Sequence, residues 1–283
     1  MKIIIIGARG MLGQELARAF QKDKPLLWDR HEIDISDEPQ VSEKINEIKP
    51  AVVINAAAYN DVDGAEKNEA LANKINGFGP GYLAKATRAS GGILVHYSTD
   101  YVFRGDKREG YREDDQPEPQ SAYARSKYLG EQHVQKYTDR FYLIRLSRLF
   151  GQPASSETAK KSFVQLMLEL AKTKSELNVV NEERDCPTYA SDLARRTQEI
   201  ISQQKQFGIY QLTNAGSCTW YEFAQEIFTI KGIGVKLNSV PASFFPRPAA
   251  RPQYSILINT KLPPLRPWQE ALAEFLAVSK DGV

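Results

Sequence analysis

The sequence predicts an α/β protein built on a doubly wound parallel sheet, with a smaller, partly interleaved C-terminal domain. Short aliphatic runs alternate with amphipathic helical segments through residues 1–150, a pattern typical of a parallel sheet covered by helices on both faces. A glycine-rich turn joins the first aliphatic run to the first helical segment. After Gly151 the alternation loosens and prolines accumulate, which indicates a second unit.

The predicted elements of residues 1–150 follow from hydrophobic periodicity. Apolar runs bounded by polar or glycine residues predict strands, and apolar residues three or four positions apart predict helices. We expect strands at residues 2–6, 26–28, 51–55, 92–96 and 141–146, and helices near 11–21, 38–48, 67–90 and 122–137.

Residues 151–283 are expected to form mainly a second domain, with some segments returning to the first. Helices are predicted near 160–173, 190–204, 219–230 and 268–278, and a strand at 209–212. Prolines between Pro241 and Pro267 exclude long helices, because proline lacks the N–H that a helix interior needs. We therefore expect loops there that are able to wrap a ligand.

The glycine turn has the spacing G-x-x-G-x-x-G, formed by Gly7, Gly10 and Gly13. Glycine permits a positive φ and lets the backbone approach a pyrophosphate, whose charge the helix starting near Met11 can meet with free N–H groups. An acidic residue is expected at the tip of the second strand, and Asp29 occupies that place. This is a Rossmann-type dinucleotide site, and we expect residues 1–150 to be the dinucleotide-binding domain.

Tyr123 and Lys127 lie four residues apart on a predicted helix, so the phenol and the ammonium share one face. A nearby positive charge lowers the pKa of a phenol from about 10 and makes it a usable acid and base. An exposed helix face without function explains the spacing equally well when the pair is considered alone. The neighbouring strand tips add candidates, because 92–96 runs into Ser98 and Thr99, whose hydroxyls suit a polar reacting atom.

Composition narrows the function classes. The net charge of +2 over 283 residues favours neither nucleic acid nor a membrane surface, and no apolar run is long enough to span a bilayer. Cys186 and Cys218 are the only cysteines, and the histidines lack metal-ligand spacing, so neither a disulfide framework nor a structural zinc site is expected. We expect a cytoplasmic enzyme without bound metal.

The chain resembles the extended short-chain dehydrogenase/reductases and, within them, the dTDP-4-dehydrorhamnose reductase family. The matching stretches are GARGMLG from 7, NAAAYNDVDGAE from 55, HYSTDYVFRG from 96, YARSK from 123, CPTYASDLA from 186, YQLTNAGSCTWYEFA from 210 and RPAARPQYS from 247. The resemblance implies reduction, with NADPH or NADH, of the 4-keto group of a nucleotide-linked 6-deoxy sugar, and most simply of dTDP-4-dehydro-L-rhamnose.

The resemblance also implies the site. Thr99, Tyr123 and Lys127 are the implied catalytic set, in which Tyr123 gives the proton, Lys127 lowers its pKa and holds the nicotinamide ribose, and Thr99 donates a hydrogen bond to the same oxygen. The implied cofactor contacts also include Gly7, Gly10, Met11, Leu12, Asp29, Asp34, Ile35, Ala56, Ala58 and Tyr59. The expected substrate contacts are Thr99, Asp100, Tyr101, Arg148, Arg247 and Arg251, of which the last two are expected near the pyrophosphate.

Cofactor choice depends on opposed charges. Asp29 suits the ribose 2′-hydroxyl of NAD, whereas Arg9 and Arg30 suit the 2′-phosphate of NADP. Two guanidiniums around one phosphate should outweigh one carboxylate. We therefore expect NADPH as the preferred cofactor, with NADH still usable.

The chain departs from the family pattern at two places. Arg148 stands where the family usually has tryptophan beside the sugar, and Glu182, Glu183 and Asp185 lie in a segment that usually reads Asp-Gln-x-Gly-x-Pro-Thr. A buried guanidinium needs an acidic partner or an anionic ligand, so Arg148 either pairs with one of these carboxylates or binds an anion of the substrate.

Two further expectations concern assembly and alternative functions. Some relatives bind magnesium between subunits. Glu15 supplies one carboxylate of that site, but Ser191 stands where a second carboxylate would be, so we expect no bridging metal and a monomer or weak homodimer.

Two alternative functions remain: a sugar-nucleotide epimerase or dehydratase, and a non-catalytic regulatory subunit like the partner of methionine adenosyltransferase. The first would not consume added NADPH, and the intact Thr99, Tyr123 and Lys127 argue against the second.

Overall fold

A six-stranded parallel sheet organises the computed structural model, which describes residues 1–155 and 161–278. The strand order is β10-β5-β4-β3-β1-β2, with every neighbouring pair parallel. The strands are β1 (Ile3–Ile6), β2 (Leu26–Trp28), β3 (Val52–Asn55), β4 (Ile93–Thr99), β5 (Phe141–Leu146) and β10 (Gly208–Gln211). The chain winds in opposite directions from the boundary between β1 and β3, which is where ligands bind in such sheets.

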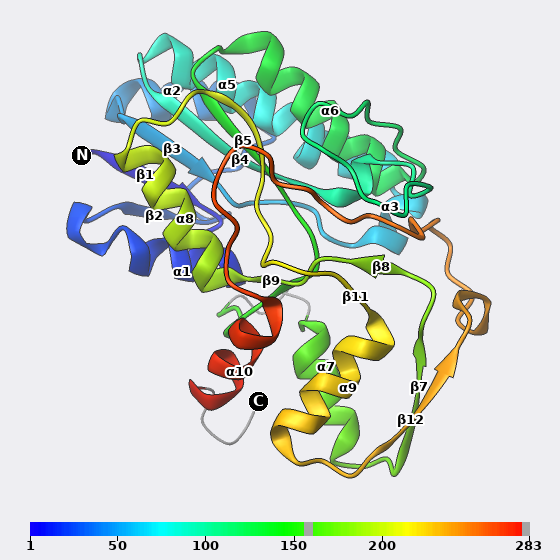
Figure 1. Cartoon of the computed structure of the whole chain (residues 1–283). Coiled ribbons are helices and arrows are strands. Elements are labelled where there is room, and N and C mark those ends of the chain that lie inside the picture. Colours follow the sequence, from blue (N-terminus) through cyan, green and yellow to red (C-terminus); the bar gives the residue numbers. More distant parts are fainter. Residues whose placement is uncertain (156–160, 279–283) are drawn as a thin grey trace.

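Helices cover both faces of the sheet (Figure 1). On one face lie α1 (Met11–Ala19) and α8 (Ala190–Ser202); on the other lie α2 (Glu38–Ile48), α5 (Gly79–Ala89) and α6 (Ala122–Tyr137). Strand β1 shows why both faces are filled, because Ile3 and Ile5 join the core under α1 and Ile4 and Ile6 join the core under α2. An all-isoleucine strand is therefore buried on both sides, as the doubly wound fold requires.

The predicted helix at 67–90 corresponds to a continuous helical run over residues 69–89, made of α4 (Glu69–Ala72), a π-helix (Asn73–Phe78) and α5. A separate short helix, α3 (Val62–Lys67), precedes it. Asn68 lies between α3 and α4, and its side-chain oxygen accepts a hydrogen bond from the N–H of Leu71, so it caps α4. The wider π turn that follows places Asn76 against α6, as described below.

A second core lies below the sheet, made by α7 (Phe163–Ala171), α9 (Trp220–Lys231) and α10 (Trp268–Val278) (Figure 1). The predicted helix near 160–173 corresponds to α7, and residue 160 lies outside the described residues. A parallel pair of strands, β7 (Glu176–Val180) and β12 (Lys236–Val240), borders this core and was not predicted. Alternate residues of β7, such as Leu177 and Val179, face the core while Glu176 and Asn178 are exposed.

The later chain returns twice to the main sheet, as helix α8 and as edge strand β10. Between the two cores lie short strands: β6 (Leu149–Phe150) pairs with β9 (Thr188–Tyr189), and β8 (Arg184–Asp185) pairs with β11 (Cys218–Thr219). The segment 241–267 crosses the same region and bridges to Arg184 and Tyr111 through Tyr254 and Leu257. Within the described ranges, no helix is both long and apolar enough to cross a membrane.

Candidate active site

The glycine turn lies at the switch point between β1 and β3. Gly7 has a φ of +78°, and a Cβ there would stand 2.7 Å from the backbone nitrogen of Ala57, so no side chain fits. A Cβ at Gly13 would lie 2.1 Å from the Gly7 oxygen, which explains the close packing of α1 on the turn. Gly10 precedes α1 and gives its first turn no side-chain cap. The free N–H groups of that turn fit a pyrophosphate.

The carboxylate of Asp29 ties the turn to the tip of β2. Its two oxygens accept hydrogen bonds from the backbone N–H groups of Arg9, at 3.2 Å, and Arg30, at 2.7 Å. Both arginine side chains are exposed. Asp29 therefore already accepts from two backbone donors, and the two residues that supply them carry guanidinium groups, which suit a phosphate.

The other residues expected along the cofactor lie at neighbouring strand tips. Asp34 accepts hydrogen bonds from the N–H and hydroxyl of Ser36, and these bonds lower the pKa of its carboxyl. Ile35 is buried against Gly79 at the start of α5. Met11, Leu12, Ala56, Ala58 and Tyr59 line the glycine turn and the end of β3 at partly or fully buried positions.

Helix α6 carries the tyrosine and lysine, and its start is held in place. Ser121 caps it by accepting from the N–H of Ala124 at 3.2 Å, and Glu66 accepts from the N–H of Ala122 at 2.7 Å. Asn76, which sequence analysis did not single out, donates to Ser126 at 3.0 Å and exchanges two hydrogen bonds with the backbone of Tyr59. Asn76 thus fixes α6 relative to the β3 tip.

Lys127 is buried and reaches across to β4. Its Nζ donates to the carbonyl oxygen of Tyr97 at 2.6 Å. Burial lowers the pKa of Lys127 to about 8, an effect that the carboxylate of Glu131 opposes. Glu131 is itself held by the guanidinium of Arg145 through two hydrogen bonds of 3.0 and 2.7 Å. Neither Glu131 nor Arg145 was among the predicted site residues. Glu131 lies on a helix and Arg145 in a strand, and nothing in the sequence indicates that the two side chains meet.

Thr99 lies between Tyr123 and Asp100. Its hydroxyl is bonded to that of Tyr123 and donates to Asp100 Oδ1 at 3.0 Å. Burial, reinforced by the Asp100 charge, raises the pKa of Tyr123, and Thr99 opposes the rise. The expectation that Lys127 lowers this pKa is not met in the structure, because the lysine is directed to the Tyr97 carbonyl. Tyr123 consequently holds its proton at neutral pH, as a proton donor must.

Arg148 lies beyond these residues and contacts Asp185. Its Nε is 2.7 Å from Asp185 Oδ1, and Nη1 donates to the carbonyl of Thr219 at 3.0 Å. The guanidinium carbon stands 3.8 Å from the ring centre of Trp220, close enough for a cation–π interaction. Burial raises the pKa of Asp185 to about 6, and Arg148 opposes this. Of the carboxylates considered, Asp185 is the partner.

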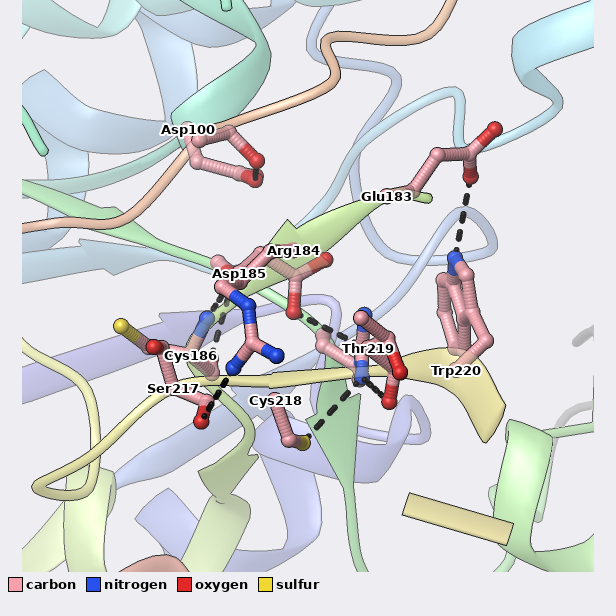
Figure 2. Close-up of polar contacts among 12 residues, drawn as sticks. Asp100, Glu183, Arg184, Asp185, Cys186, Ser217, Cys218, Thr219 and Trp220 are labelled. Carbon is pink, nitrogen blue, oxygen red and sulfur yellow. Dashed lines mark hydrogen bonds and ion pairs between the residues drawn. The ribbon is translucent and has the colours of Figure 1, made fainter. Parts of the chain in front are cut away.

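The remaining arginines are also paired. Arg247 bonds to Glu183. Glu183 also accepts from the indole N–H of Trp220 at 3.1 Å (Figure 2). Arg251 forms two bonds with Asp63, at 2.6 and 2.7 Å, and this pairing lowers the pKa of Asp63 to about 2. Tyr101 stacks edge-on against Tyr123, with ring centres 6.2 Å apart. The assignment of Arg247 and Arg251 to a pyrophosphate stays a prediction.

Metal ligands do not gather around Glu15, whose carboxylate bonds to Arg18 on the same helix. Across residues 1–155 and 161–278, no group of three or more His, Cys, Asp or Glu side chains has the arrangement of a metal site. His96 is buried, with Nδ1 at 3.2 Å from the side-chain nitrogen of Asn55, and therefore contributes to packing between β3 and β4.

A family model described as the RmlD substrate binding domain matches residues 1–280. The chain belongs to this family. The spore coat polysaccharide biosynthesis protein SpsK of Bacillus subtilis is 37% identical, with 97% of this chain and 96% of that protein aligned. A crystal structure of a dTDP-4-dehydrorhamnose reductase from Clostridium acetobutylicum superposes with a TM-score of 0.92 at 38% identity, covering 98% of this chain and 99% of that one.

A second similar solved structure is that of the dTDP-4-dehydrorhamnose reductase of Bacillus anthracis in complex with NADP, with a TM-score of 0.92, 36% identity and coverage of 98% of this chain and 99% of that one. Likeness over the whole length means that both cores of the chain, including the irregular segments between them, follow the RmlD arrangement.

Proposed function

We propose that this protein reduces the 4-keto group of a nucleotide-linked 6-deoxy sugar, converting dTDP-4-dehydro-L-rhamnose to dTDP-L-rhamnose with NADPH. The observation that carries the proposal is the hydrogen-bonded group of Tyr123 and Thr99 at the carboxyl end of β4, with Lys127 buried beside them. Membership of the RmlD family and the names of its relatives give the substrate class.

The residues of the glycine turn fit the cofactor. The uncapped start of α1 would hold the pyrophosphate, and Arg9 and Arg30 would hold the 2′-phosphate beside Asp29. NADPH, when bound, supplies the hydride. Gly7, Gly10, Met11, Leu12, Asp34, Ile35, Ala56, Ala58 and Tyr59 complete the proposed cofactor contacts, and residues 1–150 form the dinucleotide-binding domain.

The protein's part in the reaction is to place donors on the oxygen that becomes an alkoxide. Tyr123 donates its proton to that oxygen, and Thr99 orients the phenol. The ammonium of Lys127 is buried and binds the nicotinamide ribose in this proposal. The raised pKa of Tyr123 does not obstruct donation, because an alkoxide is a stronger base than a phenolate.

The sugar and nucleotide would lie between the two cores. Asp100, Tyr101 and Arg148 belong to the sugar end, whereas Arg247 and Arg251 lie on the proline-rich segment and would exchange their carboxylate partners for the pyrophosphate. Residues 151–283 thus supply mainly the substrate domain. We further propose a cytoplasmic monomer or weak homodimer.

The test is loss of NADPH absorbance with a panel of nucleotide-linked 4-keto sugars, including dTDP-4-dehydro-L-rhamnose. We expect consumption with that sugar and not with the corresponding 4-hydroxy sugars. Tyr123→Phe is the matched control. Interconversion of sugars without NADPH consumption would instead identify an epimerase, and tight cofactor binding without turnover would identify a binding subunit.

A further inference from the structure

Thr99 links the phenol of Tyr123 to the carboxylate of Asp100, and a threonine hydroxyl carries only one proton. When Asp100 is ionised, that proton points to Asp100 Oδ1, and the phenol proton of Tyr123 points to Thr99. When Asp100 is protonated, the directions reverse. Thr99 then donates to Tyr123, and the phenol proton is free to point at a substrate oxygen.

Asp100 is held where such a reversal is possible. Its second oxygen, Oδ2, accepts from the hydroxyl of Ser255 at 2.6 Å, and the side chain is buried. Ser255 also donates its N–H to the carbonyl of Arg184 at 2.9 Å, so the 241–267 segment fixes Asp100 relative to strand β8. Figure 2 shows Asp100 facing the strand that carries Asp185.

Asp185 contributes a second buried carboxylate, with Arg148 behind it. Two buried carboxylates that repel one another cannot both ionise readily, so the pair retains a proton. The guanidinium of Arg148, 2.7 Å from Asp185, favours the ionised form of that residue. The proton of the pair is therefore placed on Asp100, whose carboxylate is bonded to the hydroxyls of Thr99 and Ser255 and to no cation among the described residues.

We propose that Asp100 is the proton reserve of this site, returning a proton to Tyr123 through the Thr99 hydroxyl after each turnover. The proposal rests on the proposed reductase function. It adds to that function a positioning and relay role for Asp100, and it assigns the Arg148–Asp185 pair the task of keeping the proton on Asp100.

The O–H bond of Tyr123 breaks as the substrate oxygen gains that proton. The Thr99 hydroxyl proton then passes to the phenolate, and the Asp100 carboxyl proton passes to the Thr99 oxygen. Asp100 is left as a carboxylate and takes a proton from solvent when product leaves. The net proton comes from water, and the hydride comes from NADPH.

The groups facing Asp100 support a titration near neutral pH. Burial and then repulsion from Asp185 raise the pKa of Asp100 to about 7, and the Ser255 and Thr99 hydrogen bonds oppose the rise. The charge of Asp100 also acts on the titratable groups of Tyr101, Tyr123 and Cys186. The charges of Glu183 and Arg251 act on Tyr101, and those of Arg148 and Glu183 act on Asp185.

The experiment measures kcat against pH for NADPH-dependent reduction of dTDP-4-dehydro-L-rhamnose in the parent and three variants. We expect parent kcat to fall as the pH rises through about 7, because Asp100 then loses its proton. Asp100→Asn, which cannot supply a proton, should lack this decline and lose about ten- to a hundredfold in kcat. Its first turnover should keep nearly the parent rate of hydride transfer, because Tyr123 begins protonated.

Two variants move the decline in opposite directions. Asp185→Asn removes the repelling charge and should shift the decline to lower pH. Ser255→Ala removes a hydrogen bond that stabilises the ionised form and should shift it to higher pH. A purely structural role for Asp100 would not produce opposite shifts. Parent turnover combined with an unchanged pH profile in all three variants would overturn the relay and leave the reductase function intact, whereas no parent turnover would reject both.

Discussion

Arg148 Nε lies 2.7 Å from Asp185 Oδ1, and the two side chains are only 2% and 7% exposed. Both positions depart from the family pattern, in which tryptophan and glycine are usual. The two departures therefore form one contact and are best understood as a single change. Because the guanidinium is also stacked on Trp220, it is held away from the free surface and serves the packing between the two cores.

Arg148→Met should destabilise the fold by about 3–5 kcal/mol, because it leaves Asp185 buried and unpaired. The free energy of unfolding in urea measures this. Arg184→Met is the matched control, since Arg184 pairs with Glu222 at a partly exposed position and its loss should cost less than about 1 kcal/mol. Equal losses in the two variants would show that Arg148 and Asp185 do not form a buried pair.

Replacing both members with the family residues tests whether Arg148 binds substrate. Arg148→Trp alone should be unstable, and Arg148→Trp with Asp185→Gly should recover stability. The double variant should keep activity on dTDP-4-dehydro-L-rhamnose at low pH, with its decline in kcat shifted to lower pH because the repelling charge of Asp185 is gone. The comparison uses melting temperature and kcat/KM together. A stable double variant that has lost all activity on every 4-keto sugar would mean that Arg148 recognises an anionic group of the substrate.

Tyr123→Phe should abolish nearly all turnover, by about 10²- to 10⁴-fold, while leaving NADPH affinity near the parent value, because only a hydroxyl is lost. Lys127→Ala should weaken both turnover and NADPH binding, since Lys127 is assigned to the cofactor ribose as well. Steady-state kinetics and NADPH fluorescence titration separate the two effects. Full activity in Tyr123→Phe is incompatible with its role as proton donor.

Cofactor preference should follow the two arginines around Asp29. We expect kcat/KM for NADPH to exceed that for NADH modestly, and Arg9→Ala to reduce the preference by about tenfold, the order of one charge-assisted phosphate contact. Lys22→Ala, on an exposed helix away from the turn, serves as the control. A preference for NADH that persists in Arg9→Ala contradicts the assignment.

Stability should depend on pH through Asp100. Its pKa is about 7 in the folded protein against an ordinary value of 3.8, so between these values only the folded state retains the proton. The free energy of unfolding therefore falls as pH rises from about 4 to 7. The Asp100→Asn variant has no carboxyl to deprotonate at this position, so its free energy of unfolding should not fall in this way. Relative to the parent it should therefore gain about 1–4 kcal/mol as the pH rises from about 4 to 7. Melting curves at pH 5 and 8 provide the measurement.

The main sheet and its helices were predictable because burial on both faces gives continuous apolar strands, and β1 is the clearest case. The helix predicted at 67–90 is present over residues 69–89, and Asn68 caps its start. Its π-helical turn at Asn73–Phe78 was not predicted, because hydrophobic spacing does not distinguish a π turn from an α turn. Strands β7 and β12 were missed because they pair only with each other across a long separation and each has one exposed face.

The site could be predicted where a motif fixes the spacing of residues along the chain, as for Tyr123 and Lys127 on one helix. Contacts between segments that are distant in the sequence could not be predicted. Asn76 reaches α6 only because a π turn directs it there, and the Thr99–Asp100–Ser255 chain joins residues 155 positions apart. The direction of the Tyr123 pKa was mistaken for a similar reason, since burial and the Asp100 charge raise it while Lys127 is directed to the Tyr97 carbonyl.

Hydride transfer is tested with NADPH that carries deuterium at the transferable position of the nicotinamide and with dTDP-4-dehydro-L-rhamnose as substrate. The position of the label in the sugar product is read by NMR and mass spectrometry. We expect one deuterium at sugar C4, one NADPH consumed per sugar, and no incorporation with Tyr123→Phe. Product formed without deuterium at C4 would mean that the protein does not reduce the 4-keto group with NADPH.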